Sequence, residues 1–213
     1  MNESRPQLRA YRYRFYPTSA QAAMLARTFG CARYIYNWAL HVRTAAYHER
    51  KEHLGYQETS SALTALKQQP ESTWLNEVSS VPLQQALRHL DTAFRSFFAH
   101  RARYPRFKKK RGKQAATYAS SAFRYDAVAQ TLTLAKMDAP LDIRWSRPLP
   151  KGVQPTTVTV SRDTAGRYFV SFLVEADIAP LPAVEAQVGI DLGLHDLVVL
   201  DNGEKVGNPH FFR

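Results

Sequence analysis

Hydrophobic and basic positions alternate along residues 8–16, near the start of the chain. Because successive side chains of a strand point to opposite faces, this alternation predicts a strand with one aromatic and one cationic face. The aromatic face comprises Tyr11, Tyr13 and Phe15, and the cationic face comprises Arg12 and Arg14. Pro17 ends the strand, and the spacing of Thr18 and Gln21 is typical of a capping box that begins a helix.

Three helical stretches follow this strand. Apolar stripes predict two helices, or one bent helix, up to about residue 50, with Gly30 as a break or a close-packing point. A short helix follows Gly55 and ends before Pro70. The clearest helix begins at Ser80, because a proline stands in its first turn and apolar residues recur at helical spacing. These apolar residues, for which we expect core packing, are Leu83, Leu87, Leu90, Phe94, Phe97 and Phe98.

From residue 130 onward the pattern changes from helical to alternating. The alternating runs predict antiparallel strands that form a small barrel or sheet. A loop ending in Gly166 joins the last two runs, and glycine suits the positive φ of such a hairpin. The runs are residues 131–134, 141–145, 156–161 and 167–174.

The last part of the chain has the pattern of a separate unit. Prolines within residues 179–183 predict a short, stiff interdomain linker. After it, the apolar runs 188–192 and 197–200 predict two buried strands. Residues 202–203, Asn-Gly, predict a turn toward a third strand.

Composition and charge narrow the choice of partner. With 213 residues, of which 45% are apolar, the chain can bury a core and form one or two domains. Its net charge of +11 and isoelectric point near 9.9 indicate an anionic partner, most often nucleic acid and less often a membrane surface or an acidic protein. Residues 187–213 have more acids than bases, so we expect the basic and the carboxylate parts to be different functional units.

Cys31 is the only cysteine in the sequence. A single cysteine excludes an internal disulfide framework and a zinc ribbon within this sequence. Its apolar helical surroundings predict a small core residue rather than a nucleophile. The first residues lack the apolar core of a signal peptide, and no apolar run has the length of a membrane span. We therefore expect a cytoplasmic, nucleoid-associated chain with no membrane partner.

Residues 101–113, here named the basic segment, are rich in basic residues and contain no acid. A run of like charge repels itself, so we expect it to become ordered on an anion such as the phosphates of nucleic acid. Tyr104 and Phe107 within it can stack on bases or ribose. A solvated basic loop and a localisation-type tract are the alternatives. The basic residues are Arg101, Arg103, Arg106, Lys108, Lys109, Lys110, Arg111 and Lys113.

Other residues can extend this surface. Basic residues of the first strand and the helices can follow a duplex; they are Arg9, Arg12, Arg14, Arg27, Arg33, Arg43, Arg88 and Arg95. Polar residues near the predicted helix starts can read base edges, although composition alone does not select them. These polar residues are Tyr56, Thr59, Ser60, Ser80 and Gln84.

Asp191 ends an apolar strand, and Gly193 follows it where a larger side chain would obstruct approach to the carboxylate. Such a carboxylate can hold a divalent ion against a phosphate, as in ribonuclease-H-like nucleases and actin-like ATPases. Leu194 and His195 stand where the ATPases commonly have small hydroxyl residues, so the nuclease chemistry fits better. An Asp-x-Gly hairpin turn without a metal is the alternative.

Two-metal hydrolysis needs several converging carboxylates, because one aspartate cannot position both the attacking and the leaving oxygen. Asp196 and Asp201 lie around the same predicted hairpin as Asp191, so we expect turn residues there rather than further metal ligands. Binding is therefore easier to predict for this sequence than catalysis.

Four local patterns together resemble one family. Their order and separations are similar to those in the N-terminal half of transposon-encoded OrfB/TnpB proteins, the compact RNA-guided DNA endonucleases related to the type V CRISPR effectors. The resemblance covers nearly the whole chain. The patterns are residues 14–18 with Gln21, residues 30–37, residues 104–108 and residues 189–193.

The resemblance implies an α+β fold. It consists of a split wedge-type antiparallel β-barrel with an inserted helical recognition lobe, followed by the first strands of a RuvC-like ribonuclease H fold. The implied boundaries are residues 1–17 for the first barrel strand, 18–104 for the recognition lobe, 105–178 for the basic residues and the remaining barrel, 179–186 for the linker, and 187–213 for the start of an incomplete RuvC-like domain.

The resemblance also implies partners and site residues. Relatives bind a guide RNA from the transposon end and double-stranded target DNA beside a short motif, and Asp191 corresponds to their first RuvC carboxylate, a catalytic Mg²⁺ ligand. The family's later glutamate, four-cysteine zinc ribbon and final aspartate are absent from this sequence, so we do not expect this polypeptide alone to cleave DNA. The resemblance implies DNA contacts at Tyr56, Ser60, Ser80 and Gln84 and backbone contacts along residues 106–113. With three arginines from the basic surface, the expected nucleic-acid contacts are Arg12, Arg14, Tyr56, Ser60, Ser80, Gln84, Arg88, Arg106, Lys108, Lys109, Lys110, Arg111 and Lys113.

Two other roles stay open. The chain can be a nuclease-inactive, RNA-guided DNA-binding repressor that acts by occupancy. It can also be half of a magnesium-dependent nuclease that a C-terminal half completes in trans. Retention of Asp191 argues against long adaptation to the repressor role, because an inert binder does not need this carboxylate.

Overall fold

The computed structural model describes residues 5–150, 152–178, 185 and 187–209. The chain divides into two compact units, the first of residues 5–178 and the second of residues 179–213 with residues 1–4. The expected linker, residues 179–183, lies outside the described residues. The described residues contain no helix with both the length and the apolar character that crossing a bilayer requires.

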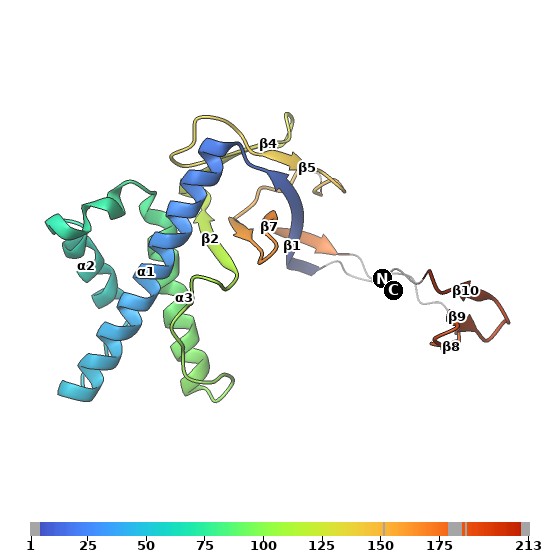
Figure 1. Ribbon diagram of the computed structural model, residues 1–213, viewed down its shortest axis with the longest axis horizontal. Coiled ribbons are helices and arrows are strands. Elements are labelled where there is room, and N and C mark those ends of the chain that lie inside the picture. The colour runs from blue at the N-terminus through green and yellow to red at the C-terminus, as the bar shows by residue number, and fades with distance from the viewer. Residues whose placement is uncertain (1–4, 151, 179–184, 186, 210–213) are drawn as a thin grey trace. The chain divides into compact units, whose positions relative to one another are not determined.

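A five-stranded antiparallel sheet forms one side of the first unit (Figure 1). Its strand order is β2-β6-β7-β1-β5, so β1 from the start of the chain pairs between strands that follow the helices. The strands are β1 (Arg5–Tyr16), β2 (Gln114–Ala119), β5 (Asp142–Arg144), β6 (Thr157–Arg162) and β7 (Tyr168–Ile178). The predicted α+β class with antiparallel strands is confirmed.

Of the predicted barrel or sheet, the structure has open sheets, and the split wedge-type barrel that the resemblance implies is not confirmed. Two further strands, β3 (Phe123–Asp126) and β4 (Thr131–Leu134), pair with each other instead of joining the larger sheet. As a result β2 and β5 remain at the two edges of that sheet, and neither of the antiparallel sheets closes.

The two faces of β1 follow the predicted alternation. Tyr13 and Phe15 are buried in a core with Val160, Val170 and Phe172 of the neighbouring strands. Tyr13 also contacts Phe172 with ring centroids 5.8 Å apart. Burial of these large apolar side chains stabilises the sheet, and it leaves the arginines of β1 on the opposite face.

Three helices and a 3₁₀ helix stand between β1 and β2 in the chain. They are α1 (Ser19–Arg50), α2 (Tyr56–Leu66), η1 (Pro70–Asn76) and α3 (Ser80–Phe98). The predicted capping box at the start of α1 is confirmed, because Thr18 and Gln21 exchange side-chain to backbone hydrogen bonds of 3.0 and 3.2 Å. The Gln21 amide also donates to the carbonyls of Ala139 and Pro140, which joins the helix start to the strand region.

Residue Gly30 neither breaks α1 nor packs closely, so both expectations for it are wrong. The helix continues without interruption through this position, and a Cβ there would meet no atom within 4 Å. Cys31 beside it is buried, as predicted for a core residue, and burial raises the pKa of its thiol to about 11. This first half of α1 is therefore a regular helix with an inert cysteine on its buried face.

A second core holds the helices together. Ile35 and Leu40 of α1 pack with the buried residues of α3 and with Leu63 of α2. The predicted core positions Leu83, Leu87, Leu90 and Phe94 are confirmed. Phe97 is only half-buried and Phe98 is exposed, so core packing is wrong for Phe98. The helical period continues to the end of α3, but the Tyr104 ring packs on Phe97 and leaves Phe98 exposed.

The described part of the second unit is a three-stranded antiparallel sheet of order β10-β9-β8. Its strands are β8 (Ile190–Asp191), β9 (Asp196–Leu200) and β10 (Lys205–Gly207). The turn at residues 202–203 is confirmed, with Gly203 at a φ of 87°. Burial of the two predicted strands is not confirmed: Val188 and Ile190 of the first and Leu197 of the second are exposed.

Candidate nucleic-acid interface

The basic segment lies along α1 and is fixed there by two polar contacts. The side-chain amide of Asn37 donates to the Lys108 carbonyl at 3.0 Å and accepts from the Lys108 N–H at 2.8 Å. The hydroxyls of Thr44 and Tyr104 lie 2.8 Å apart in a hydrogen bond. Because Asn37 and Thr44 are seven positions apart in one helix, they hold the segment at two points on the same face.

Aromatic packing adds to this attachment. The Tyr104 ring meets Phe94 and Phe97 of α3 edge to face, with centroids 5.6 and 5.2 Å apart. Pro105 beside it is buried. Uncharged contacts thus hold the segment against α1 and α3 in this structure, and ordering by an anion stays a prediction. The sequence of the segment does not reveal these contacts, because the residues that make them with the segment belong to α1 and α3.

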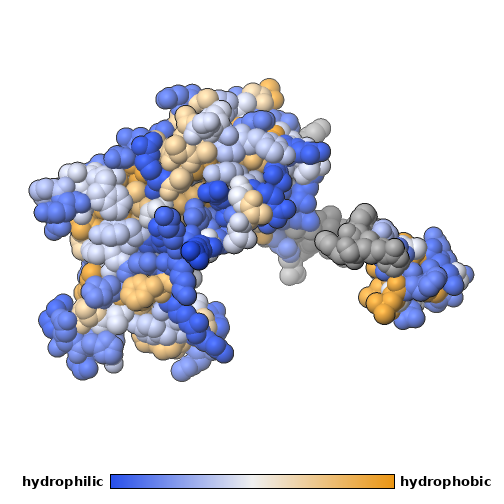
Figure 2. Space-filling model, viewed as in Figure 1, coloured by the Kyte–Doolittle hydropathy of each residue, from blue (hydrophilic) through white to orange (hydrophobic). Residues whose placement is uncertain are grey.

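The anchored segment presents cations to solvent. Within the described residues, none of its basic side chains forms an ion pair with a carboxylate. Other arginines, such as Arg43 and Arg95, share Asp91 as a partner. Hydrophilic side chains dominate the face of the molecule in Figure 2. The exposed basic residues of the segment include Arg106, Lys108, Lys109, Lys110, Arg111 and Lys113.

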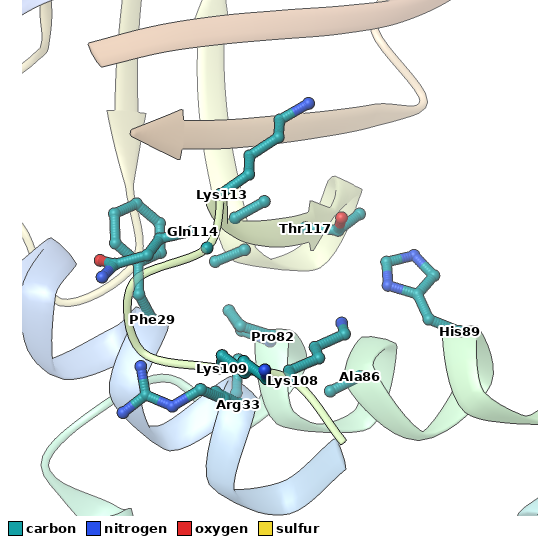
Figure 3. Close-up of a pocket in the computed structure, with 14 residues that line it drawn as sticks. Phe29, Arg33, Pro82, Ala86, His89, Lys108, Lys109, Lys113, Gln114 and Thr117 are labelled. Carbon is teal, nitrogen blue, oxygen red and sulfur yellow. The ribbon is translucent and has the colours of Figure 1, made fainter. Parts of the chain in front are cut away.

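A cavity of about 250 Å³ lies where the end of the segment meets α1, α3 and β2. Figure 3 shows Arg33, Lys108 and Lys109 on one side of it and Lys113 on the other. Its apolar wall includes Phe29, Pro82 and Ala86. A cavity with cationic sides and an apolar wall suits a phosphate joined to a sugar or a base.

Loss of solvent within this cavity changes the titration of two of its groups. It lowers the pKa of Lys108, whose Nζ lies 4.1 Å from the centroid of the Tyr36 ring. It also lowers the pKa of His89, and the charge of Lys108 adds to that effect. Both residues line the cavity, although each is exposed as a whole. A bound anion would offset the desolvation of the ammonium group.

The predicted arginines of β1 lie on the outer face of the sheet. The Arg12 guanidinium stacks over Phe169 at 3.8 Å from the ring centroid. Arg14 is directly opposite Arg144 of β5, a residue that sequence reasoning missed. The Arg14 Nε is buried and has no hydrogen-bond partner among the described residues. No local signal could identify Arg144, because the pairing joins strands far apart in the chain.

The predicted DNA-reading residues lie on two neighbouring helices. The Arg88 guanidinium of α3 lies 4.4 Å from the centroid of the Tyr56 ring, at the start of α2. Ser80, Gln84 and Arg88 are four residues apart in turn and all exposed, so they share one face of α3. Ser60 is likewise four residues from Tyr56 on α2. The structure thus brings Tyr56 and Arg88 together and arranges the others in two helical rows.

Asp191 is exposed in β8, opposite Val199 of β9. The Asp201 carboxylate accepts the Gly189 N–H at 2.8 Å, and Asp196 pairs with Lys205 at 3.6 Å. Asp201 is thus a turn residue, as expected, whereas Asp196 begins β9. The described residues contain no group of three or more histidine, cysteine or acidic side chains able to hold a metal ion. Asp191 is therefore not part of such a group within the described residues.

The turn after Asp191 gives Gly193 a role that the sequence did not predict. A Cβ at this position would lie 2.9 Å from the backbone oxygen of Asp196, closer than real Cβ contacts. The hairpin itself therefore requires glycine, whether or not a ligand approaches the carboxylate.

Comparisons with known proteins identify the family. Residues 2–52 match the helix-turn-helix domain of IS605-type OrfB proteins. Over 202 residues, 94% of this chain and 50% of the relative, the chain is 57% identical to a Streptomyces pristinaespiralis protein named "Putative RNA-guided DNA endonuclease". The chain belongs to the OrfB/TnpB family.

Two further relatives are similar to the chain over different shares of their own length. This OrfB/TnpB chain is 29% identical over 197 residues to "Putative RNA-guided DNA endonuclease InsQ" of Escherichia coli (strain K12), which covers 92% of the chain and 48% of InsQ. It is also 36% identical over 115 residues to "Virulence protein VsdF" of Salmonella dublin, covering 50% of the chain and 97% of VsdF. The chain thus spans about half the length of the two endonuclease relatives.

The described residues of the matched region do not form the two helices and the turn that the name of the domain states. Residues 5–50 form one strand and one uninterrupted helix, with residues 17 and 18 between them. Within these residues there is no second helix and no turn between helices. For this OrfB/TnpB chain, the residues predicted to contact nucleic acid lie on the basic segment, on α2 and α3, and on β1.

Proposed function

We propose that this chain is the nucleic-acid-binding N-terminal portion of a TnpB-type RNA-guided DNA endonuclease. In this role it binds a guide RNA from the transposon end and double-stranded target DNA beside a short motif, at the nucleoid in the cytoplasm. The observation that carries the proposal is the basic segment. Its cations have no carboxylate partners among the described residues, although Asn37 holds the Lys108 backbone and Thr44 holds the Tyr104 side chain.

Anchoring of the backbone favours binding of phosphate. A segment that is already ordered loses little further conformational entropy when the ligand arrives. Its exposed ammonium and guanidinium groups can then replace the counterions of a nucleic-acid backbone, which supplies affinity at any base sequence. The cationic cavity at Lys108 and Lys113 offers one enclosed phosphate position at the end of this track.

Readout of the target-adjacent motif is proposed for the rows on α2 and α3. Hydroxyl, amide and guanidinium groups are the side-chain types that bind base edges, and Ser80, Gln84 and Arg88 present one of each along a single helix face. The stack of Arg88 on Tyr56 restricts the guanidinium and fixes its direction. Arg12 and Arg14 of β1 are proposed to hold further phosphates.

Asp191 is proposed as a catalytic Mg²⁺ ligand of the family's nuclease site. An exposed carboxylate has the right chemistry for one such ligand. The described residues supply no second and third ligand beside it. They do not make up a magnesium site, so we derive no catalytic step from them.

The first test is to purify the chain from cells that express it with its neighbouring locus and to sequence the RNA that resists nuclease and a salt wash. A single defined RNA with a transposon-end scaffold is the expected result. Heterogeneous RNA, or none, would contradict guided binding and leave only affinity from charge.

A second test removes the charge of the segment. Changing Lys108, Lys109 and Lys110 together to Ala should weaken RNA binding and flatten its salt dependence, by about 0.7 to 0.9 in the logarithmic slope for each phosphate that is no longer neutralised. A matched control changes Arg50, Arg167 and Lys205 to Ala, which removes equal charge from residues that already pair with carboxylates. Equal effects of the two triple changes would mean that the segment is not the binding surface.

A further inference from the structure

An aromatic groove of about 580 Å³ lies between the end of α1 and the end of α3. One wall is formed by Phe97 and Phe98 of α3 with Tyr104 of the basic segment, and the other by Tyr47 of α1. Hydrophobic surface is visible near these helix ends in Figure 2. The groove is separate from the cationic cavity, which lies at the other end of the basic segment.

The rings of this groove are exposed to an unusual degree for aromatic side chains. Phe98 is 61% exposed, Tyr47 46% and Tyr104 43%. Phe98 contacts Phe97 at 5.3 Å and Phe94 at 6.2 Å between ring centroids. These two rings hold Phe98 in place, while the rest of its ring is exposed to solvent. The hydrogen bond of the Tyr104 hydroxyl to Thr44 fixes that ring in the same way. Rings held open at low entropic cost suit a flat apolar ligand.

Charge around the groove indicates which flat ligand fits. Tyr104 is itself part of the basic segment, with Arg101 and Arg103 beside it exposed and without carboxylate partners among the described residues. Lys51 lies 5.3 Å from the centroid of the Tyr47 ring, and the His53 ring 5.2 Å. One acid, Glu52, also lines the groove, but it pairs with Arg50 at 3.0 Å. The basic segment thus begins beside this aromatic groove and ends at the cationic cavity.

We propose that this groove stacks unpaired bases of the nucleic acid whose phosphates follow the basic segment. The inference rests on the proposed function and names a separate site within it. A strand that runs along the segment brings its bases beside Tyr104, where Phe98 and Tyr47 offer further ring faces. Stacking of this kind tolerates any base, because every base has a π-face.

The test uses the full chain and short single-stranded oligonucleotides, one with normal bases, one with abasic sites and one with 2-aminopurine. Phe98→Ala and Tyr47→Ala should each weaken binding of the normal strand by about fivefold or more, and leave the salt dependence unchanged because no cation is removed. The abasic strand should bind the parent and variants equally. Fluorescence of 2-aminopurine should fall on binding to the parent and less on binding to the variants.

Matched variants separate stacking from damage to the fold. Tyr34→Ala removes a 40% exposed ring of the same helix outside the groove and should leave binding unchanged. Phe98→Tyr and Tyr47→Phe keep an aromatic ring, so these variants should bind the normal strand as tightly as the parent does. Melting temperatures of all variants should stay near that of the parent, because the rings removed are exposed.

Three outcomes would overturn the proposal. If the basic segment variants weaken binding but Phe98→Ala and Tyr47→Ala do not, base stacking in the groove is wrong and the proposed function stands. If the parent binds no nucleic acid, both are wrong. If the parent self-associates and Phe98→Asp abolishes this without changing oligonucleotide affinity, the groove joins two copies of the chain instead.

Discussion

Asn37 mimics a neighbouring strand for Lys108: its amide both donates to the carbonyl and accepts from the N–H of that one residue. The two residues are 71 positions apart, so this contact fixes the path of the basic segment along α1. It satisfies two backbone groups of a segment that belongs to no helix or strand. Tyr36, the residue before Asn37 in α1, also contacts Lys108 through its ring.

Asn37→Ala should release the segment. Loss of two hydrogen bonds should lower the free energy of unfolding by about 1 to 2 kcal/mol and speed hydrogen exchange of the Lys108 amide. RNA affinity should fall as well, because a mobile segment loses more entropy on binding. Asn76→Ala, which removes a single side-chain hydrogen bond to Lys67, is the control. Unchanged exchange at Lys108 would show that the segment is held by other contacts.

Tyr118 should make the fold sensitive to alkali. Burial raises the pKa of this phenol from 10.0 to about 12. Between these values the unfolded chain loses the proton while the folded chain keeps it, so stability is complete below about pH 10 and falls as the pH rises toward 12. The loss should reach about 3 kcal/mol at most.

Urea unfolding of the parent and Tyr118→Phe from about pH 8 to about pH 11.5 measures this effect. The difference in unfolding free energy between the two proteins should be constant below about pH 10 and should shrink or reverse above it, since only the parent has the titrating group. Parallel curves across the whole range would mean that the phenol titrates equally in both states.

Arg14 and Arg144 should repel each other across β1 and β5. They are directly opposed, and like charges in such pairs are destabilising. Arg144→Thr should therefore raise the free energy of unfolding by about 0.5 kcal/mol, with a smaller gain at high salt. Arg124→Thr is the control, because Arg124 faces Thr133 instead of an arginine. A gain of the same size in the control would assign the effect to threonine rather than to relief of repulsion.

Local patterns in the sequence predicted those parts that depend on neighbouring residues. Alternation placed Tyr13 and Phe15 in the core, and the spacing of Thr18 and Gln21 marked the first helix. Hydrophobic periodicity and helix capping depend on residues a few positions apart, so they can be recognised without knowledge of the fold.

The rest depends on contacts between distant parts of the chain. The contact of Asn37 with Lys108 has no signal in either local sequence. The period of α3 includes Phe98, but whether a helix position is buried depends on what lies opposite it. Similarly, the strands around residue 130 alternate correctly, yet the pattern does not reveal that β3 and β4 pair with each other and leave the larger sheet open.

Gly193 distinguishes a structural from a functional reason for a glycine beside Asp191. Its missing Cβ is required by the backbone oxygen of Asp196, 2.9 Å from the position the Cβ would take. Gly193→Ala should therefore loosen the β8–β9 hairpin by about 1 to 3 kcal/mol, seen as faster amide exchange in β9. Gly207→Ala, where a Cβ meets no atom within 4 Å, should leave that exchange unchanged. If Gly193→Ala also leaves it unchanged, the glycine serves access to the carboxylate and not the turn.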